Sequence, residues 1–172
     1  MSAPPPRPAL TERDLVLLQL IAAEAPLTTI ADRAGIPADQ VADAIDAVLA
    51  VTGTRTRAHA AAWATAQRIV TATSEPCAAQ TAAPALPPRL LQVLRGWAGG
   101  HTSDELTDLF GVAPATMRSY SKTILGELGV RSQTQAAIAG VLCDLVRLTH
   151  VDPAWPAVPL GAASSPTARR AA

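Results

Sequence analysis

Apolar residues recur at intervals of three and four positions through much of the chain, which is the spacing of one face of an α-helix. Leu91, Leu94 and Ala98 have this spacing and predict a helix that ends at Gly99 and Gly100. The same spacing returns in the segments that follow and in the first half of the chain. The pattern predicts an all-α protein.

Residues that start and stop helices accompany this pattern. Thr102 followed by Glu105 is a capping box and predicts the start of a second helix. Pro114 suits the first position of a third helix, where its missing N–H costs nothing, and Ser132 can cap a fourth. The second and third helices are predicted to stop at glycines, Gly111 and Gly129.

This order of apolar positions and helix-boundary residues occurs twice in the chain. Shifting residues 10–70 by 76 positions places them on residues 86–146 without a gap. The shift aligns these identical pairs: Leu10/Leu86, Arg13/Arg89, Leu18/Leu94, Gly35/Gly111, Leu49/Leu125, Gly53/Gly129 and Arg55/Arg131. The leucines and glycines among them fall at predicted core and helix-end positions. Chance identity in an alanine-rich chain is the alternative, but self-similarity at one fixed period favours a duplication. We therefore predict two tandem four-helix domains.

Proline and small residues dominate the rest of the chain. We expect residues 1–9 to be a disordered N-terminal tail, 71–85 a flexible linker, and 147–172 a mostly disordered C-terminal tail. Trp155 lies in that last segment, where packing or disorder is favoured over docking on a partner.

The second repeat carries a longer motif. Residues 116–136, TMRSYSKTILGELGVRSQTQA, join a polar helix face, a Leu-Gly-Val helix end and the start of the next helix. Leu86-x-x-Arg89-x-x-x-Val93-Leu94 and Glu105-Leu106 before Gly111-Val112 precede it. This order resembles the C-terminal DNA-binding domain of LuxR/FixJ-type regulators, a four-helix form of the helix-turn-helix.

In that family the third helix enters the major groove of double-stranded DNA. The resemblance therefore implies these DNA-binding residues: Thr116, Arg118, Ser119, Tyr120, Lys122 and Arg131. Their chemistry agrees, because arginine can bind a guanine edge through two hydrogen bonds and lysine can neutralise a phosphate. An ordinary solvated helix face is the alternative. Glu127 stands where the family usually has a basic residue.

The first repeat has different chemistry on its third predicted helix. Ala42 and Asp46 stand where the second repeat has Arg118 and Lys122. Its predicted exposed side has three carboxylates and no cation, and DNA phosphates would repel it. We expect this domain to be a scaffold, or to bind a protein partner at its acidic face. The alternative is that three other residues suffice for DNA: Gln40, Arg55 and Arg57.

The predicted fourth helix of the first repeat, residues 58–70, is rich in small side chains around Trp63. Its equivalent in the second repeat, residues 136–146, is apolar on more than one face. This exceeds what one small core can cover. In LuxR-type domains the fourth helix commonly pairs two domains. The resemblance therefore implies a homodimer or an internal pseudo-dimer through these helices.

Composition narrows the function classes. The 172-residue chain has a formal net charge of zero, which gives no support for strong nonspecific nucleic-acid binding. Two cysteines, no secretory signal and no long apolar run predict a cytoplasmic protein, nucleoid-associated on DNA, with no membrane partner. The dispersed histidines, His59, His101 and His150, predict no catalytic or metal site, no cofactor and no enzyme activity.

These observations favour a DNA-binding transcription regulator that uses residues 86–146. A protein of another class is the alternative: an adaptor whose helix-turn-helix domains have drifted from DNA and bind a regulator or RNA polymerase.

Overall fold

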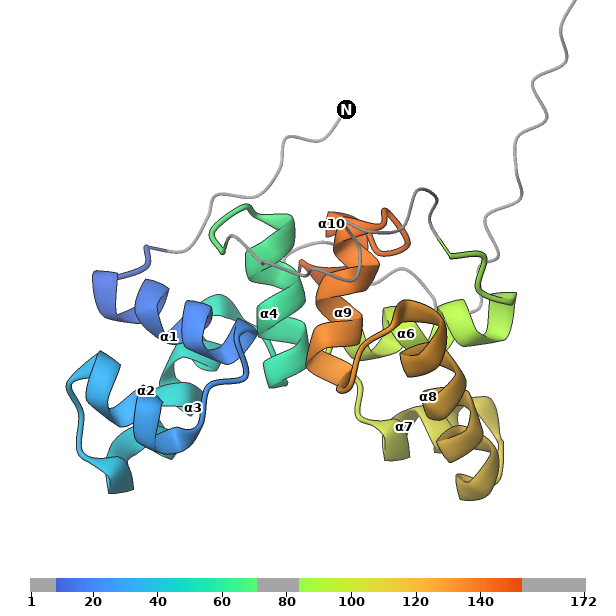
Figure 1. Cartoon of the computed structure of the whole chain (residues 1–172), viewed down its shortest axis with the longest axis horizontal. Coiled ribbons are helices and arrows are strands. Elements are labelled where there is room, and N and C mark those ends of the chain that lie inside the picture. Colours follow the sequence, from blue (N-terminus) through green and yellow to red (C-terminus); the bar gives the residue numbers. More distant parts are fainter. Residues whose placement is uncertain (1–8, 71–83, 153–172) are drawn as a thin grey trace, which may run out of the picture.

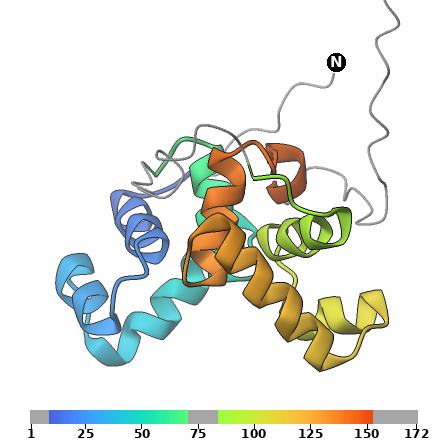
Figure 2. The same ribbon diagram turned by 45° about the vertical axis from the view of Figure 1, so that its right-hand side comes forward.

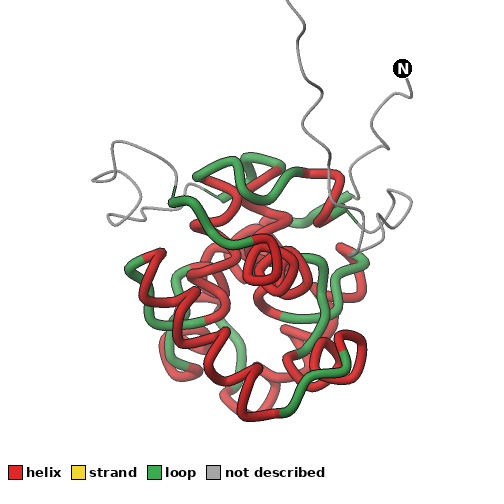
Figure 3. Tube along the Cα trace, turned by 90° about the vertical axis from the view of Figure 1, so that its right-hand side faces the viewer, coloured by secondary structure: helices red, strands yellow, loops and turns green. Residues whose placement is uncertain are grey.

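The computed structural model describes residues 9–70 and 84–152. Helices and loops account for all of these residues (Figures 1 and 3), which confirms the all-α prediction. The elements are α1 (Glu12–Ala22), α2 (Leu27–Ala34), the 3-10 helix η1 (Ala38–Gln40), α3 (Val41–Thr52), α4 (Arg57–Ala66), α6 (Pro88–Ala98), α7 (Ser103–Phe110), α8 (Pro114–Leu128), α9 (Gln133–Leu142) and α10 (Leu148–Val151). None of these helices is both long and apolar enough to cross a membrane.

Helix boundaries repeat with the period of the sequence. A shift of 76 positions carries α1 onto α6, α2 onto α7, η1 with α3 onto α8, and α4 onto α9. Left-handed backbone turns recur in the same register, since Gly35 and Gly111 have φ of 63° and 60°. Glycine adopts such φ values without the steric cost that a Cβ imposes. The repeated sequence therefore has a repeated backbone.

The predicted helix starts of the second half are confirmed. Thr102 Oγ1 accepts a hydrogen bond from the Glu105 N–H at 3.2 Å, and the Glu105 carboxylate accepts one from the Thr102 N–H at 2.9 Å. Pro114 is the first residue of α8. Ser132 caps α9 by accepting from the Gln135 N–H at 3.1 Å.

The fourth helices differ from the prediction at their ends. They were expected over residues 58–70 and 136–146, yet α4 ends at Ala66 and α9 begins at Gln133 and ends at Leu142. Arg68 and Asp144 have left-handed φ values of 57° and 55°, which turn the chain back on itself. This turn brings the last residue of each expected helix, Val70 and Val146, into the core at 7% and 1% exposure.

The centre of the molecule is the pair α4 and α9, which lie side by side in Figures 1 and 2. Their contact is the most extensive between any two described helices. α1 packs against α4 and α6 against α9. One cluster of buried apolar side chains runs through both halves.

Part of the predicted C-terminal tail is folded. Residues 148–151 form α10, which packs against α4 and α6, and Val151 is 1% exposed. The remaining expectations for the flanks, including Trp155, concern residues 1–8, 71–83 and 153–172, which lie outside the described residues.

Candidate nucleic-acid interface

α8 presents a cationic face to solvent. Arg118 and Lys122 are four residues apart and therefore lie on the same side of the helix, and both are exposed. Ser119, beside them, is exposed, and Thr116 is half-buried. The helix is anchored from its opposite side, where three apolar side chains are at most 3% exposed: Met117, Ile124 and Leu128.

Neither cation of this face is engaged elsewhere. Within residues 9–70 and 84–152, the side chains of Arg118 and Lys122 make no hydrogen bond and no ion pair. Other arginines are occupied. The Arg95 Nε donates to the Leu145 carbonyl at 3.1 Å, and the Arg89 guanidinium lies 4.7 Å from the centre of the Phe110 ring. The two charges on α8 are therefore available to a ligand.

Three hydroxyls of α8 donate to backbone carbonyls one turn earlier. Ser119 Oγ lies 3.1 Å from the Ala115 oxygen, and Thr123 Oγ1 lies 3.0 Å from the Ser119 oxygen. Ser121 does the same with Met117 at 2.9 Å. Each hydroxyl proton is thus committed, while the oxygen lone pairs can still accept from a base amino group.

The other two predicted contact residues have different settings. Tyr120 is half-buried and packs against the core, so part of its ring supports α8. Arg131 is exposed in the turn between α8 and α9. Its backbone N–H donates to the Gln135 Oε1 at 3.0 Å, which holds the turn beside the start of α9.

In the first half, carboxylates occupy the corresponding face. Asp39, Asp43 and Asp46 are all exposed on η1 and α3. Asp43 and Gln40 line a shallow hollow of about 290 Å³ together with Arg13 of α1. This face can attract a cationic group and would repel a phosphate.

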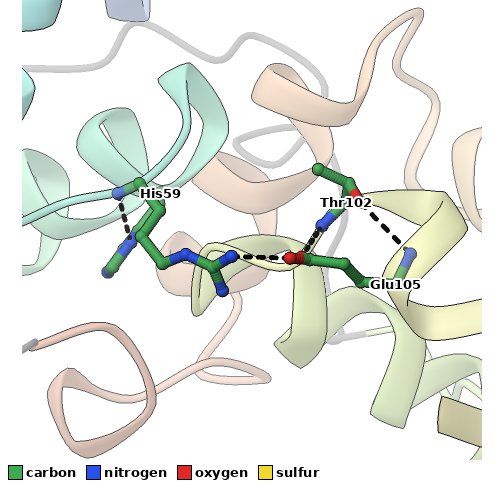
Figure 4. Close-up of polar contacts among 4 residues, drawn as sticks. His59, Thr102 and Glu105 are labelled. Carbon is green, nitrogen blue, oxygen red and sulfur yellow. Dashed lines mark hydrogen bonds and ion pairs between the residues drawn. The ribbon is translucent and has the colours of Figure 1, made fainter.

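An ion pair joins the two halves, as Figure 4 shows around Glu105. Arg55 Nη2 lies 2.6 Å from Glu105 Oε1, and the other carboxylate oxygen accepts the capping hydrogen bond from the Thr102 N–H. This hydrogen bond, and next the one from Arg55, lowers the pKa of the Glu105 carboxyl. The sequence alone does not reveal this pair, because nothing local relates residues 50 positions apart.

His59 is buried beside this ion pair (Figure 4). Its Nδ1 accepts from the Arg55 N–H at 3.2 Å, and its Nε2 lies 2.6 Å from the Val151 carbonyl oxygen. A ring that accepts at Nδ1 and donates at Nε2 is neutral. Burial, aided by the charge of Arg55, lowers the pKa of His59. His59 thereby ties α4 to α10.

The first turns of α4, α7 and α9 surround a hollow of about 350 Å³. Arg57 and His101 line it, and so does the carboxylate residue Asp104. The N-caps of these helices satisfy only the third N–H of each. The hollow therefore has backbone donors that suit an anion, opposed by the charge of Asp104.

The described residues contain no group of three or more histidine, cysteine, aspartate or glutamate side chains placed to hold a metal ion. The structure thus assembles one exposed cationic helix face and one exposed acidic face at equivalent places of the repeat. No protein-family model, no curated protein and no solved structure matches the chain.

Proposed function

We propose that this protein is a non-enzymatic DNA-binding transcription regulator that reads the major groove with α8. Residues 86–146 would form the DNA-binding helix-turn-helix domain and residues 10–70 a domain that serves as scaffold or interaction module. The observation that supports this most is the exposed, unpaired pair Arg118 and Lys122 on a helix anchored by its buried side. The resemblance of residues 116–136 to LuxR/FixJ-type domains points the same way.

The local geometry suits this role. α7 and α8 are joined by a short turn in which Gly111 has φ of 60°, and α8 begins at Pro114. A helix of this kind fits the major groove, where each base pair presents its own pattern of donors and acceptors. Arg118 can bind a guanine through two hydrogen bonds, and Lys122 can neutralise a phosphate.

Charge elsewhere limits the expected affinity. The chain has no net charge, so long-range attraction to DNA is weak. Glu127, exposed on the last turn of α8, adds repulsion if it faces a phosphate. Binding would then depend on few phosphate contacts, and its salt dependence would be shallow.

The test is a gel-shift titration on DNA selected from a random pool, comparing the wild type with Arg118→Ala and Lys122→Ala. Arg118→Ala should weaken the selected complex about 5- to 150-fold, the equivalent of about 1–3 kcal/mol for a base contact. Lys122→Ala should weaken all sequences alike and lower the salt slope by about one.

Arg33→Ala is the matched control, because Arg33 is an exposed cation in the last turn of α2 and its loss changes the net charge equally. It should leave the affinity within about 2-fold, as expected when the charge makes no phosphate contact. If all three variants lower the affinity for the selected DNA equally, or if no sequence-specific complex forms, the proposal is wrong.

A second candidate is the protein-interaction adaptor, and the acidic face of η1 and α3 favours it. Asp39, Asp43 and Asp46 are exposed, and Arg55 is already paired with Glu105. A basic segment of a regulator or of RNA polymerase would complement this face. An adaptor predicts no specific DNA complex, and binding to the basic partner that weakens when Asp43 and Asp46 become asparagine.

A further inference from the structure

We propose that a single chain, acting as a monomer, binds a DNA site without dyad symmetry and reads bases on one side only. This inference rests on the proposed function. The contact between α4 and α9 already pairs the two repeats inside one chain.

The contact joins equivalent helices of the repeat, since a shift of 76 positions carries α4 onto α9. Ala60 and Ala61 of α4 correspond to Ala136 and Ala137 of α9, and all four are 0% exposed. A contact between matching surfaces is what a two-fold homodimer forms between chains. Here both partners belong to one molecule.

The central residues of this surface are not available to a second chain. Every residue of α4 from Ala58 to Thr65 is buried, and so are those of α9 from Ala136 to Gly140. The two halves are also held by the Arg55–Glu105 ion pair and by the hydrogen bond between His59 and Val151. A homodimer through the fourth helices would first have to break these contacts.

The pairing places both third helices on one side of the molecule. α3 and α8 lie toward the lower side of the views in Figures 1 and 2, away from α10. Dimeric helix-turn-helix proteins present their two reading helices in this way, to half-sites about one helical turn apart. A single chain thus presents α3 and α8 in the way that a helix-turn-helix dimer presents its two reading helices.

Only one of these helices suits a phosphate-lined groove. At matched positions, Arg118 and Lys122 stand against Ala42 and Asp46, and Ser119 stands against Asp43. These three positions carry two positive charges on α8 and two negative charges on α3. Phosphates would attract the first and repel the second. Base recognition is therefore confined to α8, and the DNA site that the protein prefers has no inverted repeat.

The experiment selects DNA with the full-length wild type and weighs the complex by native mass spectrometry. One 17.7 kDa chain per duplex is expected. The selected sequences should lack dyad symmetry. Randomising the base pairs one turn away, where α3 would lie, should change Kd by less than about 2-fold, as expected where no base is contacted.

Moving the cations of α8 to the matching positions of α3 tests whether charge is what keeps α3 from contacting DNA. A42R with D46K should let the chain bind an inverted repeat of the selected half-site at least about 10-fold more tightly than the wild type, since new phosphate and base contacts form. Q19R with E24K is the matched control, with the same gain of three charges at exposed positions of α1 and the turn after it. It should give less than a third of that gain.

The outcomes separate the two proposals. Two chains of wild type on a dyad-symmetric site, or loss of binding when the α3 side is randomised, would overturn this inference and leave DNA reading by α8 intact. An absence of any specific complex would remove the proposed function and this inference with it. A transplant no better than its control would show that charge does not exclude α3.

Discussion

His59 and Gln135 stand at equivalent positions of the repeat and perform the same local task. Each accepts a hydrogen bond from the backbone N–H four residues earlier, at 3.2 Å for His59 and 3.0 Å for Gln135. Only the histidine titrates. Burial lowers the pKa of His59 below its ordinary 6.5, so the folded state takes up a proton less readily than the unfolded chain. The free energy of unfolding should therefore fall as the pH drops below about 6.5.

His59→Gln should flatten this decline, because glutamine can accept the same hydrogen bond without binding a proton. Part of the decline should remain, since burial and Arg95 also lower the pKa of His150. Urea unfolding at several pH values between 5 and 7.5 measures the slope. If the free energy of unfolding of the variant falls with pH as steeply as that of the wild type, His59 is not the source of the decline.

Glu105 differs from His59 in that its charged form, rather than its neutral form, is favoured by the fold. Its pKa is lowered from 4.5 by the Thr102 N–H and by Arg55, so its stabilising contribution is present above pH 4.5 and is lost as the pH falls below that value. Glu105→Gln should lower the urea midpoint at pH 7, and its curve should approach that of the wild type as the pH falls below 4.5. A constant difference across this range would contradict the assignment.

At the scale of the element, helix boundaries with a local capping signal were predicted better than the ends of the fourth helices. Thr102, Pro114 and Ser132 act on backbone groups within three residues, so their role is visible in a short window of sequence. The ends of α4 and α9 were missed because Arg68 and Asp144 adopt left-handed φ, which is uncommon for residues other than glycine. Burial of the following valines accounts for these turns.

Two glycines inside helices should respond oppositely to alanine. A Cβ on Gly96 of α6 would come within 2.6 Å of the Leu106 side chain, which is itself 0% exposed. Gly96→Ala should therefore lower the free energy of unfolding by about 1–3 kcal/mol. Gly126 of α8 has no atom within 4 Å of such a Cβ, and Gly126→Ala should raise it by about 0.5–1 kcal/mol. Thermal unfolding monitored by circular dichroism distinguishes the two signs.

The seam between α4 and α9 should not tolerate charge. Ala139→Glu places a carboxylate at a 0% exposed position and should cost several kcal/mol, whereas Ala47→Glu on the exposed side of α3 should change stability by less than about 0.5 kcal/mol. Val141→Glu, half-buried on α9, should fall between them. Thermal stability together with light scattering checks this series. Equal melting temperatures for all three variants would mean that the seam does not hold the fold.

At the scale of the whole molecule, the sequence predicted the repeat and the contrast between the faces of α3 and α8, because side-chain types at fixed spacing carry both. It did not decide whether the fourth helices pair within or between chains. That choice depends on contacts such as Arg55 with Glu105, which only the folded chain brings together.

Because α4 and α9 belong to one polypeptide, dilution cannot separate them. A regulator that must first dimerise from free subunits loses its active form as expression falls, and its dose–response curve steepens. With the proposed binding of one chain to one DNA site, the occupied fraction of a single promoter site should follow a simple hyperbola with a Hill coefficient of about one. Cells that make few copies would then respond in a graded manner, without a threshold.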